Sequence, residues 1–345
     1  MRRHKPETQT LYAQLFETTA SYELELIGGF ANGLVVEREV RGRTYVYWQL
    51  RDLGGRLRQV YLGPQGTQRA EALRAALVVT KARRAPILED LERLTAAYLA
   101  SGGARHQGNH FKIVDALARA GLFRFGAILV GSHAFVSIGA ALGVSWSAGT
   151  IATGDVDLCR DEFVSVACEH LETIDIPGVL AGVDPTFFLV PELDLKAPST
   201  SMQSRAAGVK VDLLTTARTP RDTTPRRVAP LGLAAQPLRS MDYLVRDDVE
   251  RALFIGPHAV MVNVPHAGRY ALHKLAVATR RRDAIKSDKD RRQAAALILA
   301  LAEMQPGALR HAADAARAHH DRGLVRDMRA SLERLAPELR AAVKL

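Results

Sequence analysis

The stretch that decides the fold reads Ala127-Ile-Leu-Val-Gly-Ser132, and Thr153-Gly-Asp-Val-Asp-Leu158 follows it after a helical segment. A third run, Val209-Lys-Val-Asp-Leu-Leu214, again places one Asp among aliphatic residues. Such runs are typical of strands, and side chains two residues apart on a strand point to the same face. We therefore expect Asp155 and Asp157 to share one face, with the Val and Leu of that run directed to the core.

The Asp of the third run, Asp212, is expected on a strand close to Asp155 and Asp157. Three such carboxylates repel one another, and divalent cations relieve the repulsion; Mg²⁺ prefers oxygen ligands of this kind. We predict that all three are catalytic residues and metal ligands for two Mg²⁺ ions, with Mn²⁺ as an alternative. Two ions can clamp the attacking and leaving oxygens of a phosphoryl displacement. Asp155 and Asp157 would hold both ions, and Asp212 would bind the catalytic ion and help to deprotonate an acceptor hydroxyl.

The junction Gly131-Ser132 joins the first strand to a helix. Exposed N–H groups and the positive end of the helix dipole form an anion site at such a junction. We assign Gly131, Ser132 and Thr153 to nucleotide binding, with the β- and γ-phosphates of an NTP as ligands. The alternative is an ordinary helix cap beside a solvated strand face. An Asp pair alone is weak, because 37 acidic residues among 345 give roughly four such pairs by chance, so the order of the motifs carries the prediction.

This order of motifs resembles the polymerase-β nucleotidyltransferase superfamily. Residues 130–143, which begin Val-Gly-Ser-His-Ala-Phe, and residues 149–158, which begin Gly-Thr-Ile-Ala-Thr, more closely resemble a bacterial family described only as nucleotidyltransferase fold proteins. Residues 42–64 share in this resemblance, which covers roughly residues 30–300. It implies an α/β (α+β) fold with a small mixed sheet and metal-dependent transfer of NMP from an NTP, with release of pyrophosphate. The resemblance does not identify the acceptor substrate.

Basic residues outside these motifs are candidates for phosphate binding. Residues 269–281 resemble a helix that follows the catalytic domain in related families, and basic residues at such positions contact the nucleotide. On this resemblance we assign Lys274, Lys286 and Lys289 to nucleotide binding; the alternative is a solvated helix face. Arg205 precedes the third strand, and an Arg suits bidentate phosphate contacts. We assign no metal to His319-His320, which is expected on a solvated helix face.

The N-terminal part combines helices with a basic β-hairpin unit. A helix is predicted over residues 6–27, three strands over 34–40, 44–50 and 57–62, and helix again over 67–101, in two pieces around Pro86. Arginines and aromatic residues alternate in this unit, as suits nucleic acid, because cations bind phosphates and rings stack on bases. The alternative is that the aromatic rings pack the unit onto the next helix. The basic and aromatic residues are Arg41, Arg43, Tyr45, Tyr47, Trp48, Arg51, Arg56, Arg58 and Tyr61.

The predicted domains are an N-terminal helix–hairpin–helix module over residues 1–103, a catalytic domain over 104–265 and a C-terminal helical domain over 266–345. Further strands are expected at 125–130, 187–193 and 260–264, and an irregular connection over 218–237. The NTP would lie between the catalytic and C-terminal domains.

Composition and charge set the wider class. The net charge of +10 and the pI near 9.8 favour polyanionic partners such as nucleic acid or NTPs. The two cysteines form no zinc-type or CxxC motif, and no apolar run of 18 residues or more occurs, so we predict a cytoplasmic location without membrane association.

The leading functional hypothesis is transfer of NMP, for example from ATP, to RNA, with a tRNA 3′ end as one such acceptor. A toxin or defence role fits the resemblance, and a protein partner such as an antitoxin stays open. The second hypothesis is NMP transfer to a protein or a small molecule. The third is a catalytically silent protein that binds nucleic acid or NTP on the same fold, against which the presence of all three acids argues.

Overall fold

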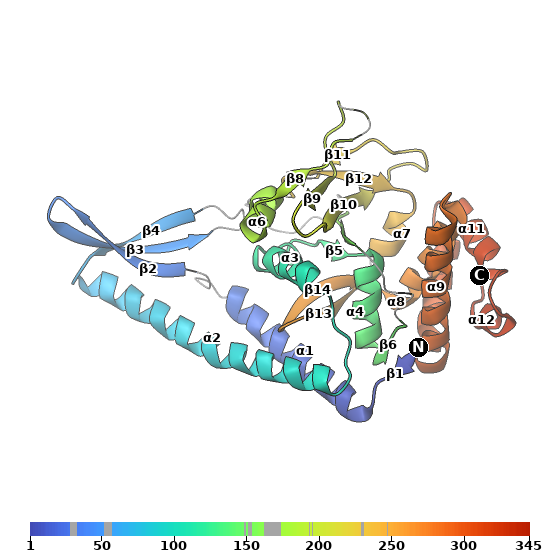
Figure 1. Ribbon diagram of the computed structural model, residues 1–345, viewed down its shortest axis with the longest axis horizontal. Helices are drawn as coiled ribbons and strands as arrows, with labels where there is room; N and C mark the ends of the chain where they lie inside the picture. Colours follow the sequence, from blue (N-terminus) through green and yellow to red (C-terminus); the bar gives the residue numbers. More distant parts are fainter. Residues whose placement is uncertain are drawn as a thin grey trace.

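The computed structural model describes residues 1–27, 33–51, 57–147, 150, 154–161, 174–192, 194, 196–228, 231–246 and 248–345. Helices and several small sheets alternate along the chain, which confirms the predicted α+β class. Figure 1 shows a body built on the central sheet, with helices at one side and a long arm projecting from the other.

The N-terminal part forms the arm and its support. Its elements are β1 (Arg2–Arg3), α1 (Pro6–Ile27), β2 (Gly33–Val40), β3 (Arg43–Arg51), β4 (Leu57–Pro64) and α2 (Gln68–Ala100). Strands β2, β3 and β4 form an antiparallel sheet in that order, as the three strand predictions require. The prediction of two helices around Pro86 is wrong, because α2 continues through it. A proline removes one backbone donor, and contacts of α2 with α1 and with β4 favour the continuous helix.

The central part contains the largest sheet. Its elements are α3 (Gly108–Arg119), β5 (Ile128–Leu129), α4 (Gly131–Ala141), β6 (Val144–Ser145), β7 (Asp155–Cys159), α6 (Ile176–Val183), β8 (Phe187–Leu189), β9 (Ser201–Ser204), β10 (Lys210–Thr216), β11 (Arg226–Arg227), β12 (Ala234–Leu238), α7 (Met241–Val245), β13 (Val249–Ile255) and β14 (Ala259–Pro265). The strand order is β11-β12-β10-β7-β5, with β9 also on β10 and β8 on β9. Strands β7, β10 and β12 are parallel, whereas β5 and β9 run antiparallel to their neighbours, so the sheet is mixed as predicted.

Several strands differ from the prediction. The strand expected over 125–130 is only β5, and the one expected over 187–193 is only β8. The connection expected to be irregular over 218–237 contains β11 and most of β12, whose Ala-Ala-Gln-Pro-Leu sequence has little strand character. Pairing with β10 decides this conformation, since Leu214 lies opposite Gln236 in parallel register.

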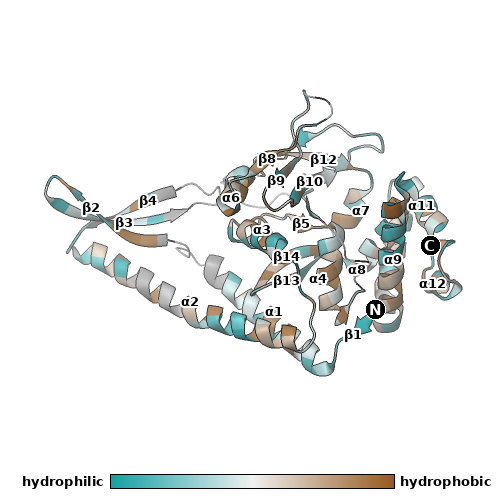
Figure 2. Ribbon diagram, in the orientation of Figure 1, coloured by the Kyte–Doolittle hydropathy of each residue, from teal (hydrophilic) through white to brown (hydrophobic). Residues whose placement is uncertain are grey.

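The β13–β14 hairpin divides two hydrophobic clusters by strand alternation. Phe254 and Val262 belong to the main core with the central sheet, whereas Leu253 and Met261, on the other face, pack with α1 and α2. In Figure 2 apolar colours gather on α4 and this hairpin in the middle of the molecule. The hairpin therefore joins helices α1 and α2 to the central sheet.

The C-terminal part is helical, as expected, and covers one end of the sheet. Its elements are α8 (Ala267–Arg280), α9 (Ala284–Met304), α10 (Pro306–Ala318), α11 (Gly323–Leu332) and α12 (Pro337–Ala342). Buried side chains from α8 to α11 belong to the same cluster as those of β5, β7 and β10. None of the helices in the described ranges is both long and apolar enough to span a membrane.

Candidate active site

Three carboxylates lie side by side on β7 and β10. These strands are parallel neighbours, and their register places Asp212 opposite Asp157 and Lys210 opposite Asp155. Val156 is buried between the two Asp residues of β7, so the carboxylates share the other face. The structure thus brings Asp155, Asp157 and Asp212 together from segments more than 50 residues apart in the chain.

The grouping of these carboxylates carries an electrostatic cost. Burial, followed by the nearby Asp212 carboxylate, raises the pKa of Asp157 to about 6, with a smaller contribution from Asp155 and an opposing one from the Lys274 ammonium. When nearby basic side chains do not balance the negative charge of a group of carboxylates, that group attracts a cation. The donor set, carboxylate oxygens only, is the one that Mg²⁺ prefers.

Lys210 supplies part of the missing positive charge. Its Nζ lies 2.7 Å from Asp212 Oδ1. Burial opposes the charged form, but the hydrogen bond to Asp212 and the charges of Asp155 and Asp157 outweigh it and raise the pKa of Lys210. The sequence-based assignments did not include this lysine, although it stands two residues before Asp212 on the same strand face. Its position marks where a cation is attracted.

Gly131 lies against the carboxylates at the first turn of α4. Its φ is +64°, and a Cβ built there would lie 1.9 Å from Asp157 Oδ2. Only glycine allows both this backbone conformation and this close approach. The carbonyl of Gly131 accepts a hydrogen bond of 2.7 Å from the Tyr270 hydroxyl, so α8 fixes the turn in place.

Ser132 is held by a residue of the C-terminal helices. Gln293 on α9 donates from Nε2 to the Thr150 carbonyl at 2.7 Å and to Ser132 Oγ at 3.3 Å. Gln293 is fully buried. The sequence offered no sign of this contact, because it joins positions 161 residues apart. Ser132 therefore stands at the N-terminus of α4 with its hydroxyl oriented, as binding of an anion there requires.

Two of the three predicted lysines lie close to the carboxylates. Lys274 Nζ contacts Asp290 Oδ1 at 2.6 Å, and Arg281 contacts the other oxygen of that carboxylate. Burial, followed by the Lys274 charge, lowers the pKa of Lys289, while the charges of Asp290 and Asp157 oppose the shift. Lys274, Arg281 and Lys289 thus interact electrostatically with Asp157. We call these three basic residues the basic wall of the site.

The remaining predicted residues lie elsewhere or outside the described ranges. Lys286 is exposed in the first turn of α9. Arg205 is exposed after β9, with its guanidinium 4.9 Å from the centre of the Phe188 ring. Thr153 lies outside the described residues. Their assignments to nucleotide binding stay predictions.

Buried histidines form the back of the site. His133 follows Ser132 on α4, and its ring lies 4.7 Å from that of His110 and 5.4 Å from that of Phe254. Burial is the main cause that lowers the pKa of both imidazoles, and the Asp155 carboxylate partly opposes it at His110. His133 therefore packs in the core beside the site, and the sequence alone could not separate this role from a direct one.

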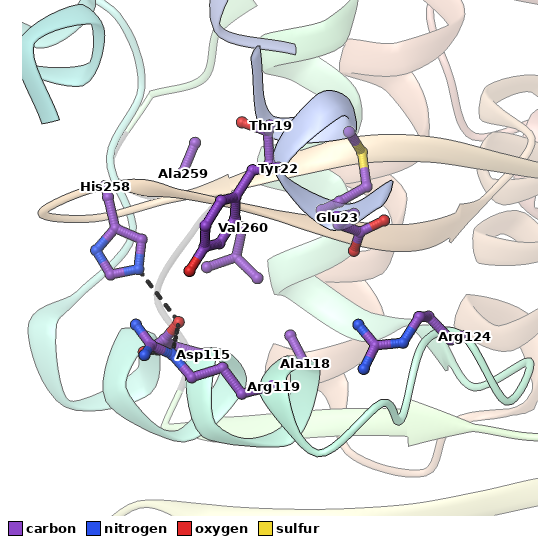
Figure 3. Close-up of a pocket in the computed structure, with 11 residues that line it drawn as sticks. Thr19, Tyr22, Glu23, Asp115, Ala118, Arg119, Arg124, His258, Ala259 and Val260 are labelled. Atoms are coloured by element: carbon purple, nitrogen blue, oxygen red, sulfur yellow. Dashed lines mark hydrogen bonds and ion pairs between the residues drawn. The ribbon is translucent and has the colours of Figure 1, made fainter. Parts of the chain in front are cut away.

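Two hollows lie away from the carboxylates. The one in Figure 3, between α1, α3 and β14, has a volume of about 30 Å³, which is room for one or two water molecules only. Its wall is closed by Asp115, which binds both Arg119 and His258. Its volume is too small for a nucleotide.

The second hollow, of about 370 Å³, is lined by Asp242, His319 and His320 among others. His319 is mostly buried and contacts Asp242 at 3.0 Å, contrary to the expected solvated face, whereas His320 is exposed. These three residues could surround a metal ion. However, His319 Nδ1 accepts the Asp321 N–H, so Nε2 carries the proton and donates it to Asp242. That arrangement leaves Nε2 no lone pair for a metal, and we assign none here.

Comparison with known protein families identifies the family of the chain. A family model described as Nucleotidyltransferase matches residues 109–318, which is well over half of the chain and spans α3, the central sheet and helices α8 to α10. No curated protein and no solved structure matches the chain. Nucleotidyltransferases take an NTP as substrate and generally use divalent metal ions. The chain belongs to this nucleotidyltransferase family and is an enzyme that transfers nucleotidyl groups.

Proposed function

We propose that this enzyme transfers NMP from an NTP to a hydroxyl group of RNA, with Asp155, Asp157 and Asp212 as its catalytic residues. The observation that supports it most is the parallel register that sets Asp212 opposite Asp157, together with the raised pKa of Asp157. The three carboxylates fit divalent cations, since their mutual repulsion is what such ions relieve. Asp155, Asp157 and Asp212 would hold two Mg²⁺ ions, which supply charge stabilisation and orientation for phosphoryl transfer when bound.

The proposed reaction is a direct displacement at the α-phosphorus of the NTP. Asp212 accepts the proton of the acceptor hydroxyl at a carboxylate oxygen. The acceptor oxygen then forms a bond to the α-phosphorus, the bond from that phosphorus to the bridging oxygen breaks, and pyrophosphate leaves. Positioning and charge account for the rate, since phosphoryl transfer needs no covalent enzyme intermediate.

The NTP phosphates would lie between the N-terminus of α4 and the basic wall. Gly131 and Ser132 present the helix terminus, where N–H groups and the dipole favour anions. Lys274, which is held by Asp290, and Lys289 both interact electrostatically with Asp157, so we assign them to the β- and γ-phosphates. Lys286, Arg205 and Thr153 keep the assignment to nucleotide binding that the sequence suggested.

The charge of the chain favours RNA as the acceptor. The net charge of +10 favours a polyanion over a neutral small molecule, and RNA offers both the charge and a terminal hydroxyl. A tRNA 3′ end is one such acceptor. Transfer to a protein or a small molecule is the competing outcome that the experiment must separate.

The test is a transfer assay with each α-³²P-labelled NTP in turn, Mg²⁺, and either total RNA or protein from a cell lysate. We expect label on RNA, and none with EDTA or with the Asp155→Ala/Asp157→Ala variant. A matched control removes two exposed carboxylates in Asp90→Ala/Asp314→Ala, which keeps the same change in charge. Label on protein would replace the RNA hypothesis, and label that persists in the Asp155→Ala/Asp157→Ala variant would refute the assignment of the site.

A further inference from the structure

The two faces of the arm sheet β2–β3–β4 have different neighbours. Val46, Trp48 and Leu62 are buried together with Ala70 of α2, so this face is packed. The packing alternative considered from the sequence therefore holds for Trp48. Strand alternation directs Tyr45 and Tyr47 to the opposite face.

That opposite face carries three tyrosines in contact. Tyr61 lies between the other two, with ring centroids 5.5 Å from Tyr47 and 6.1 Å from Tyr45, and the residue is 53% exposed. Leu34 and Val40, at the two ends of β2, are exposed on the same face. Exposed aromatic and aliphatic side chains that share one face of a projecting arm are typical of a binding surface.

Charge separates between the two faces of this sheet. Arg38 lies opposite Tyr45, and Arg43 lies opposite Val40, so both arginines share the tyrosine face. Glu37 and Glu39 alternate with them onto the other face, where Glu37 binds Arg74 of α2. Among the described side chains, the register places no carboxylate on the tyrosine face. The surface is therefore complementary to a polyanion.

We infer that the tyrosine face of the arm, defined by Arg38, Arg43, Tyr45, Tyr47 and Tyr61, binds a single-stranded segment of nucleic acid. Tyrosine rings stack on unpaired bases and arginines bind the phosphates between them. A duplex hides the faces of its bases, so it would use the arginines alone. This inference rests on the proposed RNA acceptor and extends it, because the projecting arm would bind a second part of the acceptor strand, outside the central sheet (Figure 1).

A second copy of the chain is a weaker occupant of this face. Two-fold pairing would set Arg38 and Arg43 near their own copies, where like charges repel. A single nucleic acid strand matches both the rings and the charge. The remaining alternative, an acidic protein, would use the arginines but would not require the flat rings.

The experiment measures binding of a fluorescent mixed-sequence 20-nucleotide RNA by anisotropy, with the full chain and without NTP or metal. Removing two rings in Tyr47→Ala/Tyr61→Ala should weaken binding about tenfold or more for each ring that stacks on a base. Tyr47→Phe/Tyr61→Phe should keep the affinity, since the rings remain. Arg38→Gln/Arg43→Gln should lower the slope of log K against log salt by about 0.7 for each phosphate that these arginines neutralise. Arg93→Gln, an exposed arginine elsewhere on α2, is the control for charge.

Because no turnover is needed, this result is independent of the transfer assay. Equal affinity of the Ala and wild-type proteins, or an equal loss in the Phe variant, would overturn the stacking role. Tighter binding of the matching duplex would overturn the preference for a single strand. An RNA affinity that stays unchanged while the Ala variant dissociates an oligomer in sedimentation would assign the face to self-association instead.

Discussion

Two acidic sites in this protein, one at Asp157 and one at Asp321, have opposite electrostatic environments. Asp157, on the central sheet, stands beside two other carboxylates, and its pKa is raised by burial and by Asp212. Asp321, between α10 and α11, is bound by Arg239 at 2.7 and 2.8 Å and by Ser240 at 2.7 Å. These hydrogen bonds, that of Arg239 first, hold the pKa of Asp321 well below its usual range.

The difference separates a carboxylate that stabilises the fold from one that we propose to be catalytic. Every oxygen of Asp321 has a donor, so ionisation of this group favours the folded chain. Asp157 instead destabilises the chain when it is ionised, and its charge is available to a ligand. Replacement by Asn should therefore have opposite consequences at the two positions.

The largest effect is expected for Asp157→Asn. Transfer activity should fall about 10³-fold or more, because the metal ions that Asp157 would hold stabilise the transition state of phosphoryl transfer by several kcal/mol. In EDTA at pH 7 the same variant should be more stable by about 1–3 kcal/mol, since a repelled charge is removed and solvent screens part of the effect. Urea unfolding and the transfer assay measure the two quantities. A variant that is both inactive and less stable would show that the charge of Asp157 does not destabilise the folded chain.

Gly131→Ala should damage the sheet site through its backbone. The added Cβ would meet Asp157 Oδ2, and φ is positive, so we expect a loss of about 3 kcal/mol in the free energy of unfolding, together with reduced transfer. The control is Gly182→Ala in α6, where a Cβ would meet no heavy atom within 4 Å among the described residues. Equal stability of the two Ala variants in urea would show that the turn is not constrained.

Asp321→Asn should reduce stability and spare activity. Loss of the charged partner of Arg239 costs about 2–4 kcal/mol in a mostly buried site. Because the folded pKa is depressed, this stability is present above the unfolded value near pH 3.9 and disappears only as the pH falls below it. Urea unfolding at pH 7 and pH 5 should therefore give the same difference. Asp314→Asn, an exposed carboxylate, should change stability by less than about 0.5 kcal/mol.

The smallest effect concerns a buried imidazole that belongs to neither site. Burial lowers the pKa of His106 to about 4, and its Nδ1 accepts the Ile255 N–H. The unfolded chain therefore binds more protons between about pH 6.5 and pH 4, and stability should fall by about 2–3 kcal/mol as the pH is lowered through this window. Urea unfolding of His106→Gln should show a shallower pH dependence. The same slope in both proteins would assign acid sensitivity to other groups.

Local patterns predicted much of this molecule. Alternation around Asp155 and Asp157 indicated the strand and the face that both carboxylates share, and the arm strands and the C-terminal helices followed from the same kind of reasoning. Strand β13 was missed although its partner β14 is the next strand along the chain, whereas helix continuity at Pro86 could not be predicted because it depends on tertiary contacts, those of α2 with α1. The contacts of Gln293 and Lys274 were hidden for the same reason.

The sequence by itself determined the fold class, the strand face that Asp155 and Asp157 share and the basic charge, since periodicity and composition are properties of neighbouring residues. Only the tertiary structure decided that Asp212 stands opposite Asp157, that Gly131 touches a carboxylate and that the tyrosines of the arm turn away from α2. The physical reason is that register and packing select one partner among many segments of similar composition. The repulsion between the carboxylates, the long-range hydrogen bonds and the exposure of the tyrosines arise only once the chain has folded with these partners.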